Sequence, residues 1–190
     1  MSYDLYCYRP SSDVVNLAEA EAFIDQFNAA EENGEHHNDS SQLREDIVAA
    51  LVQHNPRLER FSFDYGKIAE SLKTSVEEAR ARFQHVELNP PEGDLAIQLI
   101  VHGDLVTINV PYWYSDNRAD EVFSTLNAYL RVIRKTAGLF VYDPQTGVAF
   151  DPAVTPLNVR QYDETMREIP KIAAAAKTKK PWWKFWPQGS

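Results

Sequence analysis

The sequence predicts an α+β fold, in which a central antiparallel sheet carries helices packed mainly on one face. Segments with strand character gather in the middle of the chain, and a strongly amphipathic helix follows them. Strands and helices do not alternate in the regular way that a parallel sheet requires. We therefore expect residues 1–169 to form a single α+β domain, and residues 170–190 to be a basic, Trp-rich end of a C-terminal helix and tail.

The N-terminal third predicts one strand and two helices. Alternating tyrosines in "SYDLYCYR" (residues 2–9) indicate a strand, and the alanine-rich, amphipathic residues 11–32 indicate a helix that starts at its Ser/Asp cluster. A polar loop separates it from a second helix over residues 41–54, for which Asp39 or Ser40 is the expected cap.

The next stretch, residues 57–75, is ambiguous. Phe61 and Phe63 alternate as in a short strand, whereas the part after Gly66 has helical character. A capping-box spacing predicts a short helix in "SVEEARARF", and "QHVELN" then reads as a strand that ends at two prolines.

Residues 94–115 give the clearest element, a hairpin that turns at Gly103-Asp104. Its first strand, residues 95–101, is apolar on both faces, which predicts a central place in the sheet. The second strand places Val106, Ile108, Val110 and Tyr112 on one face.

A long helix and a second hairpin follow. Residues 115–138 form the most regular helix, with Asp116 or Asn117 as the expected cap, Gly138 as its end and an apolar stripe of Val122, Leu126, Tyr129, Leu130 and Ile133. The tight turn in "LFVYDPQTGVAFDP" predicts a hairpin, and residues 158–180 are expected to be helical.

Charge is divided unevenly along the chain. The formal net charge of −9 combines −14 over residues 1–169 with +5 over residues 170–190, which hold five lysines and no acid. An acidic body disfavours nucleic acid and suits a basic protein partner, although solubility alone would also explain it. The N-terminus lacks the features of a signal peptide and no apolar run approaches the ~18–20 residues of a membrane span, so we expect a cytoplasmic protein.

The sequence holds no familiar catalytic signature. Neither a nucleophile elbow, a zinc-protease helix nor a phosphate-binding loop is present, and we expect neither an enzyme nor a cofactor. His36 and His37 stand beside Glu35 and Asp39, but adjacent histidines on a loop rarely provide metal-ligand geometry, so no metal site is predicted. Cys7, the only cysteine, is expected to be a buried structural thiol.

Two groups of residues are candidates for contact with a partner. Glu31, Glu32, Glu35 and Asp39 could form an acidic docking patch, although such clusters are usually solvated surfaces. Trp113 could be an exposed aromatic anchor at a strand end, or could pack under the following helix.

The C-terminal "KTKKPWWKFWPQGS" is both aromatic and basic. Its contact residues would be Trp182, Trp183, Phe185 and Trp186. Membrane-surface contact, stacking on nucleic acid, and docking onto protein (this domain or a second copy of it) are the alternatives. The acidic body opposes the first two, so protein docking is favoured and membrane contact comes second.

Several segments together carry a resemblance to a known class of proteins. The "MSYDLY" strand, the "VPYW" strand end, the following helix and "VYDPQTG" look like small bacterial proteins, some of which resemble the immunity proteins of polymorphic toxin systems. The resemblance covers residues 1–152 and carries over no functional residue. It implies a non-catalytic, cytosolic inhibitor that neutralises a secreted toxin by covering its site.

The leading functional expectation is thus an immunity-type binding protein whose partner is a toxin or effector. A peripheral membrane or scaffold protein that uses the Trp-rich tail is the first alternative, and an enzyme with an unfamiliar site is the second. A homo-oligomer formed through the tail remains open, and nucleic acid is not an expected partner.

Overall fold

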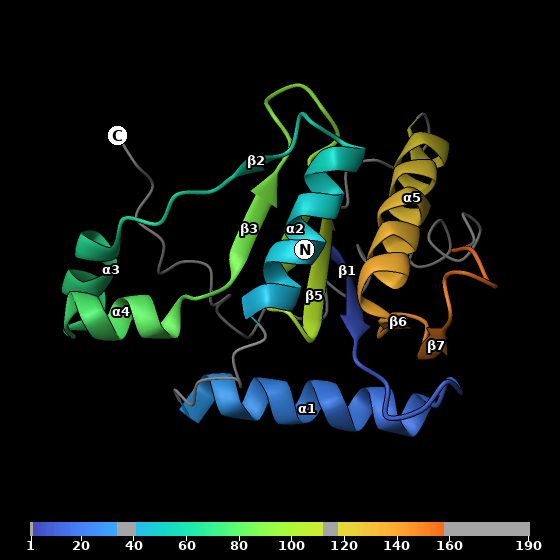
Figure 1. The fold of residues 1–190 in the computed structure, drawn as a ribbon, viewed down its shortest axis with the longest axis horizontal. Coiled ribbons are helices and arrows are strands. Elements are labelled where there is room, and N and C mark those ends of the chain that lie inside the picture. The colour runs from blue at the N-terminus through green and yellow to red at the C-terminus, as the bar shows by residue number, and fades with distance from the viewer. Residues whose placement is uncertain (1, 34–40, 112–117, 158–190) are drawn as a thin grey trace, which may run out of the picture.

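A computed structural model describes residues 2–33, 41–111 and 118–157 (Figure 1). In these ranges seven strands form one antiparallel sheet in the order β2-β3-β4-β5-β1-β6-β7. Together with five helices, the sheet confirms the predicted α+β class. The strands are β1 (Ser2–Tyr8), β2 (Glu59–Arg60), β3 (Val86–Asn89), β4 (Gln98–Val101), β5 (Leu105–Pro111), β6 (Phe140–Asp143) and β7 (Val148–Phe150).

The N-terminal strand β1 joins the two halves of the sheet. It pairs with β5 along its whole length, from Ser2 opposite Pro111 to Tyr8 opposite Leu105. Its other edge pairs with β6, where Tyr6 lies opposite Tyr142. Strands β2 to β5 on one side and the β6–β7 hairpin on the other are therefore connected only through β1 among the described strands.

Two helices, α2 (Ser41–His54) and α5 (Ala119–Ala137), lie side by side on one face of the sheet (Figure 1). The predicted apolar stripe of α5 is fully buried, and Gly138 ends the helix with the expected positive φ of 73°. The stripe packs on the inward residues of β1, β4 and β5, which include Leu5, Leu99 and Ile108. Burial of these side chains is the main stabilising contribution to the fold.

The start of α5 differs from the prediction. Arg118 occupies the N-cap position and its side chain makes no capping hydrogen bond; it pairs instead with Glu121 of the first turn. The predicted cap, Asp116 or Asn117, is therefore wrong, and both residues lie outside the described part of the chain. The acidic first turn of α5 compensates, because carboxylates are favourable at a helix N-terminus.

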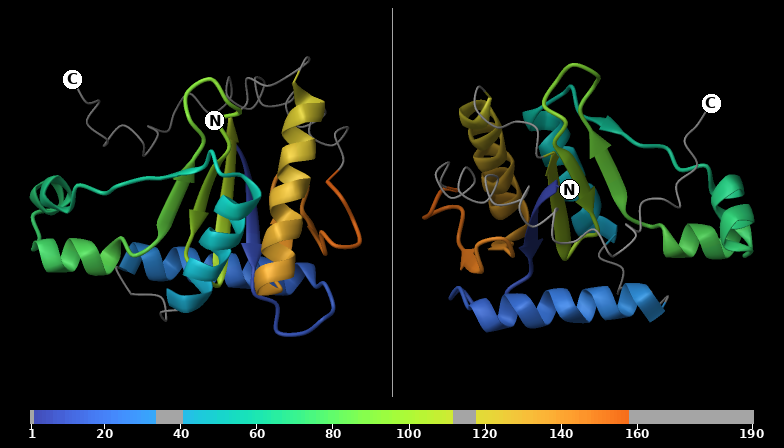
Figure 2. Two further views of the ribbon diagram at one scale, coloured as in Figure 1. Left: turned by 45° about the horizontal axis from the view of Figure 1, so that its top comes forward. Right: turned by 180° about the vertical axis from the view of Figure 1, so that it is seen from behind.

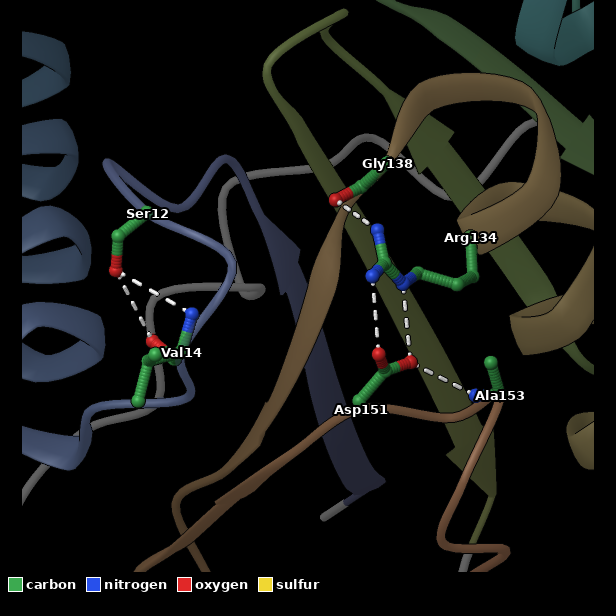
Figure 3. Close-up of polar contacts among 6 residues, drawn as sticks. All are labelled: Ser12, Val14, Arg134, Gly138, Asp151 and Ala153. Carbon is green, nitrogen blue, oxygen red and sulfur yellow. Dashed lines mark hydrogen bonds and ion pairs between the residues drawn. The ribbon is translucent and has the colours of Figure 1, made fainter.

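Helix α1 (Leu17–Asn33) runs across one end of the sheet (Figures 1 and 2). Ala20 and Ile24 pack there against Tyr8, Leu105 and Phe140, which form a second, smaller core. The helix starts at Leu17 and not at residue 11 as predicted. Asn16 accepts the hydrogen bond of the Glu19 amide, and residues 11–14 instead form a local turn in which Ser12 bonds to the backbone of Val14 (Figure 3).

Helices α3 (Tyr65–Leu72) and α4 (Val76–Arg82) resolve the ambiguous stretch of the sequence. Asp64 caps α3, and the predicted capping box of Ser75 and Glu78 is present at α4. The strand expected at Phe61 and Phe63 is wrong: the short strand here, β2, covers Glu59 and Arg60, and Phe63 packs on the rings of Tyr65 and Phe83 beyond the sheet. This helical pair stands beside the sheet rather than over it (Figure 1).

Both predicted hairpins are present. The β4–β5 turn uses Gly103 at a φ of 109°, which a residue with a side chain rarely adopts. Strand β4 is interior, as predicted, but begins only at Gln98. The Ile97 amide bonds to the Leu95 carbonyl two residues earlier, and this tight turn takes the preceding residues out of the ladder. The proposed helix at 158–180 and the unit at 170–190 lie outside the described residues.

One buried carboxylate ties β1 to the turn after β6. Asp143 is 2 % exposed, and its Oδ2 accepts a 2.5 Å hydrogen bond from the Tyr3 hydroxyl. Its Oδ1 accepts from the amides of Gln145 and Thr146, which fixes the turn. Every oxygen of this buried group thus has a donor, as a buried charge requires.

Removing the phenolic donor should destabilise the fold. We expect Tyr3→Phe to lower the free energy of unfolding by about 1–3 kcal/mol, because Asp143 keeps its burial but loses a donor. Urea unfolding followed by circular dichroism measures the change. Tyr65→Phe is the control, since its hydroxyl bonds only a part-buried carbonyl, and equal losses in the two variants would contradict the assignment.

A second polar contact holds the chain after β7 against the end of α5 (Figure 3). The Arg134 guanidinium donates to both carboxylate oxygens of Asp151 at 3.0 and 2.9 Å, and also to the carbonyl of Gly138. Asp151 accepts in addition from the Ala153 amide. Arg134 also lies over the ring of Phe140.

This contact should make stability depend on acidic pH. Hydrogen bonding to Arg134 lowers the pKa of Asp151 below its usual value of 3.8, so the ionised form stabilises the fold. That contribution is complete above the usual pKa and disappears as the pH falls through the lowered value. We expect Asp151→Asn to be less stable than the wild type at pH 7 by about 1–2 kcal/mol, with the difference shrinking below pH 4. A constant difference in thermal unfolding across pH 2.5–7 would contradict this.

Candidate binding surface

Helix α1 concentrates negative charge on a surface that faces away from the sheet. It contains five acidic residues and no lysine or arginine. Glu21, Asp25 and Glu32 are exposed, whereas Ala20 and Ile24 on the opposite side of the helix are buried. The helix is therefore fixed by its apolar side and presents carboxylates to solvent.

The C-terminal end of α1 carries an electrostatic cost. Glu31 and Glu32 stand near the C-terminus of the helix, and its last turn contains no basic residue. Carboxylates are unfavourable there, because the helix dipole places partial negative charge at this end. A cation supplied from outside the described helix would relieve this repulsion.

The predicted contact residues are only partly within the described chain. Glu31 is half-buried and Glu32 exposed, and both lie on α1 as expected. Glu35, Asp39 and Trp113 lie outside the described residues, as do Trp182, Trp183, Phe185 and Trp186. The sequence analysis did not single out Glu21 and Asp25. The sequence does indicate an acidic surface there, because no lysine or arginine occurs between Arg9 and Arg44.

The face of the sheet opposite α2 and α5 carries a row of polar side chains. Asn109 of β5 donates to Gln98 of β4 at 3.2 Å, and Gln98 donates to Glu87 of β3 at the same distance. On β1, Asp4 lies directly opposite Asn109. Figure 2 shows this side of the sheet from behind, and none of the described helices packs across its middle. The sequence analysis did not identify this row, although the polar residues that alternate with apolar residues along these strands indicate it.

Two tyrosines connect this row with α1. Tyr6 and Tyr142 are cross-strand partners on β1 and β6. Burial, and then the nearby carboxylates of Glu21 and Asp25 on α1, raise the pKa of Tyr142 above its usual value. Burial, and then the Asp4 carboxylate, raise the pKa of Tyr6. The two tyrosines stay neutral, and carboxylates lie on both sides of them: Glu21 and Asp25 on α1, and Asp4 on β1.

Asp4 is the least compensated charge on this surface. Its Oδ1 is buried and has no hydrogen-bond donor. Burial raises the pKa of Asp4 above its usual value, and the neighbouring Ser2 hydroxyl and then the N-terminal amine oppose that shift only in part. Asp4 thus costs folding free energy whenever it is ionised, in contrast to the fully bonded Asp143.

Histidines do not form a metal centre in the described ranges. His85 and His102 stack with ring centroids 4.9 Å apart, and Phe27 of α1 and Phe63 pack edge-on against them. His85 also lies 3.4 Å from a Glu87 carboxylate oxygen. No group of three His, Cys, Asp or Glu side chains within the described ranges could hold a metal ion. The rings instead join α1, the β4–β5 turn and the start of β3 into one aromatic contact.

Comparison with known proteins identifies no relative. The sequence matches no protein-family model, no functionally described protein and no solved structure. None of the helices in the described ranges is long and apolar enough to cross a membrane.

The thiol of Cys7 should be inert in the folded protein. Its side chain is fully buried on the inward face of β1, and burial strongly raises its pKa, so almost no thiolate is present at neutral pH. We expect no reaction with Ellman's reagent in buffer and complete reaction of one thiol in 8 M urea. Rapid labelling without denaturant would contradict the burial and would reopen a nucleophilic role.

Proposed function

We propose that this protein is a non-catalytic binding protein that docks a basic protein partner on α1. The observation that carries the proposal is the charge of this helix: five carboxylates, no base, and a rigid apolar attachment to the sheet. A surface fixed in this way loses little conformational freedom on binding and steers a basic partner through its field.

The partner class that fits best is a secreted bacterial toxin, with this protein as its cytoplasmic immunity-type inhibitor. Support comes from the resemblance of residues 1–152 to such proteins and from the acidic surface, since occlusion of a basic site needs complementary charge and shape but no chemistry. The exposed carboxylate of Glu32 at the C-terminal end of α1 adds to this argument, because a bound cation would relieve its conflict with the helix dipole.

Affinity purification from the native cell at low and at high salt tests the proposal. We expect one dominant partner that is lost at high salt, because exposed charge pairs are screened. Mass spectrometry then identifies it, and its chemistry decides whether it is a toxin. A protein recovered instead with membranes, through its Trp-rich end, would replace the proposal by peripheral membrane binding.

Neutralising the carboxylates of α1 should weaken binding of that partner. We expect the triple variant E21Q/D25N/E32Q to bind roughly tenfold more weakly, because three exposed charge contacts of about 0.5 kcal/mol each are removed. Isothermal titration calorimetry against the purified partner measures the loss.

A matched variant separates local from general charge effects. E59Q/E70Q/E92Q removes three exposed carboxylates from β2, α3 and the loop before β4, and the net charge changes equally. We expect its affinity to stay within about twofold of the wild type. Equal losses of affinity in both variants would show a non-specific charge effect and would rule out α1 as the docking surface.

A further inference from the structure

The acidic surface of α1 continues onto the sheet as a strip that we define as Asp4, Tyr6, Asn109 and Tyr142. Tyr142 lies next to Glu21 and Asp25, Tyr6 lies opposite Tyr142, and Asp4 lies opposite Asn109. Strands β1, β3, β4, β5, β6 and β7 contain no lysine or arginine. Among the described strands the only basic residue is Arg60 of β2, at the far edge of the sheet, and the cation that acts on Asp4 is the N-terminal amine.

The strip combines two features that a guanidinium group satisfies together. Asp4 has a buried carboxylate oxygen without a donor, and the two tyrosines present aromatic rings beside it. Side chains two positions apart on a strand share a face and lie about 7 Å apart, so Asp4 and Tyr6 are both within reach of one arginine side chain. An arginine can stack on a ring and donate to a carboxylate at the same time, whereas lysine offers a single, more strongly hydrated charge.

We propose that the strip is a second contact site for the basic partner protein, and that it receives an arginine side chain between Tyr6 and Tyr142 whose guanidinium donates to Asp4. The proposal rests on the proposed function and names the partner's side-chain chemistry. Asn109 lies opposite Asp4, and its side-chain amide donates to Gln98.

The site predicts opposite effects of one substitution on stability and on binding. An ionised Asp4 destabilises the free protein, because its raised pKa means that the fold disfavours the charged form. We expect Asp4→Asn to raise the Tm of the free protein at pH 7 by roughly 1–4 °C. The same substitution removes the charge that arginine recognises, so binding should fall. A merely structural residue would lose stability on substitution and would leave binding unchanged.

The test uses the full-length protein and defined peptides in place of the unidentified partner. Capped Gly-Arg-Gly is titrated into ¹⁵N-labelled protein and followed by amide chemical shifts, with Gly-Lys-Gly and the uncharged Gly-citrulline-Gly as matched ligands. We expect shifts centred on Tyr6, Asn109 and Tyr142, binding of the arginine peptide at least about threefold tighter than that of lysine, and none with citrulline.

Three variants decide the outcome. Asp4→Asn and Tyr142→Leu should each weaken binding of the arginine peptide at least about fivefold. Glu70→Gln on α3 should leave the affinity for this peptide unchanged. Shifts confined to α1, or equal binding by the wild type and Asp4→Asn, would overturn the proposal. Tighter peptide binding after all five lysines of residues 170–190 are changed to glutamine would also overturn it, because the chain's own basic end would then be the occupant. None of these titrations uses the native partner. The proposal for the strip can therefore be wrong while docking on α1 is correct, and docking on α1 can be wrong while the strip binds arginine.

Discussion

The hydrogen bond between Tyr3 and Asp143 joins strand β1 to the turn between β6 and β7. Strand β1 is the only described link between the two halves of the sheet, and this bond fixes its register at the β6 edge. The same carboxylate organises the β6–β7 turn through two backbone amides. Pairing of β1, closure of the hairpin and burial of the face under α2 and α5 are consequently coupled through one fully satisfied charge.

The two faces of the sheet differ in polarity, and under the proposed function the polar face takes part in recognition. The face under α2 and α5 is apolar, and its one buried acid has all its hydrogen bonds. The opposite face keeps polar side chains, two tyrosines and Asp4, whose charge lowers the stability of the free protein. Because α1 lies across the end that both faces share, its carboxylates and those of the sheet form one electrostatic surface. A partner can bind there without disturbing the core.

Features of the fold that depend on neighbouring residues in the sequence were predicted well. The features that the prediction missed depend on contacts between residues far apart in the sequence. The stripe of α5, the Ser75 capping box and both hairpin turns depend on residues a few positions apart, so the sequence states them directly. The late start of α1 and the shortness of β2 depend on the partners of Asn16 and Phe63. For the candidate surface, Glu31 and Glu32 were predictable from composition. The polar and tyrosine side chains of the opposite sheet face were not, because Tyr6 and Tyr142, like Asp4 and Asn109, become neighbours only through strand pairing.

The position of β1 in the middle of the sheet determines when the protein can become complete. Tyr3 and its acceptor are 140 residues apart, so β1 obtains its β6 neighbour only after the intervening residues have been made. Until then one edge of an apolar, tyrosine-rich strand has no pairing partner, and such edges invite association with other chains. Contacts this distant in sequence also slow folding. Between the synthesis of β1 and that of β6, the nascent chain therefore carries an interior strand with one edge unpaired, and a chaperone would matter most during this period.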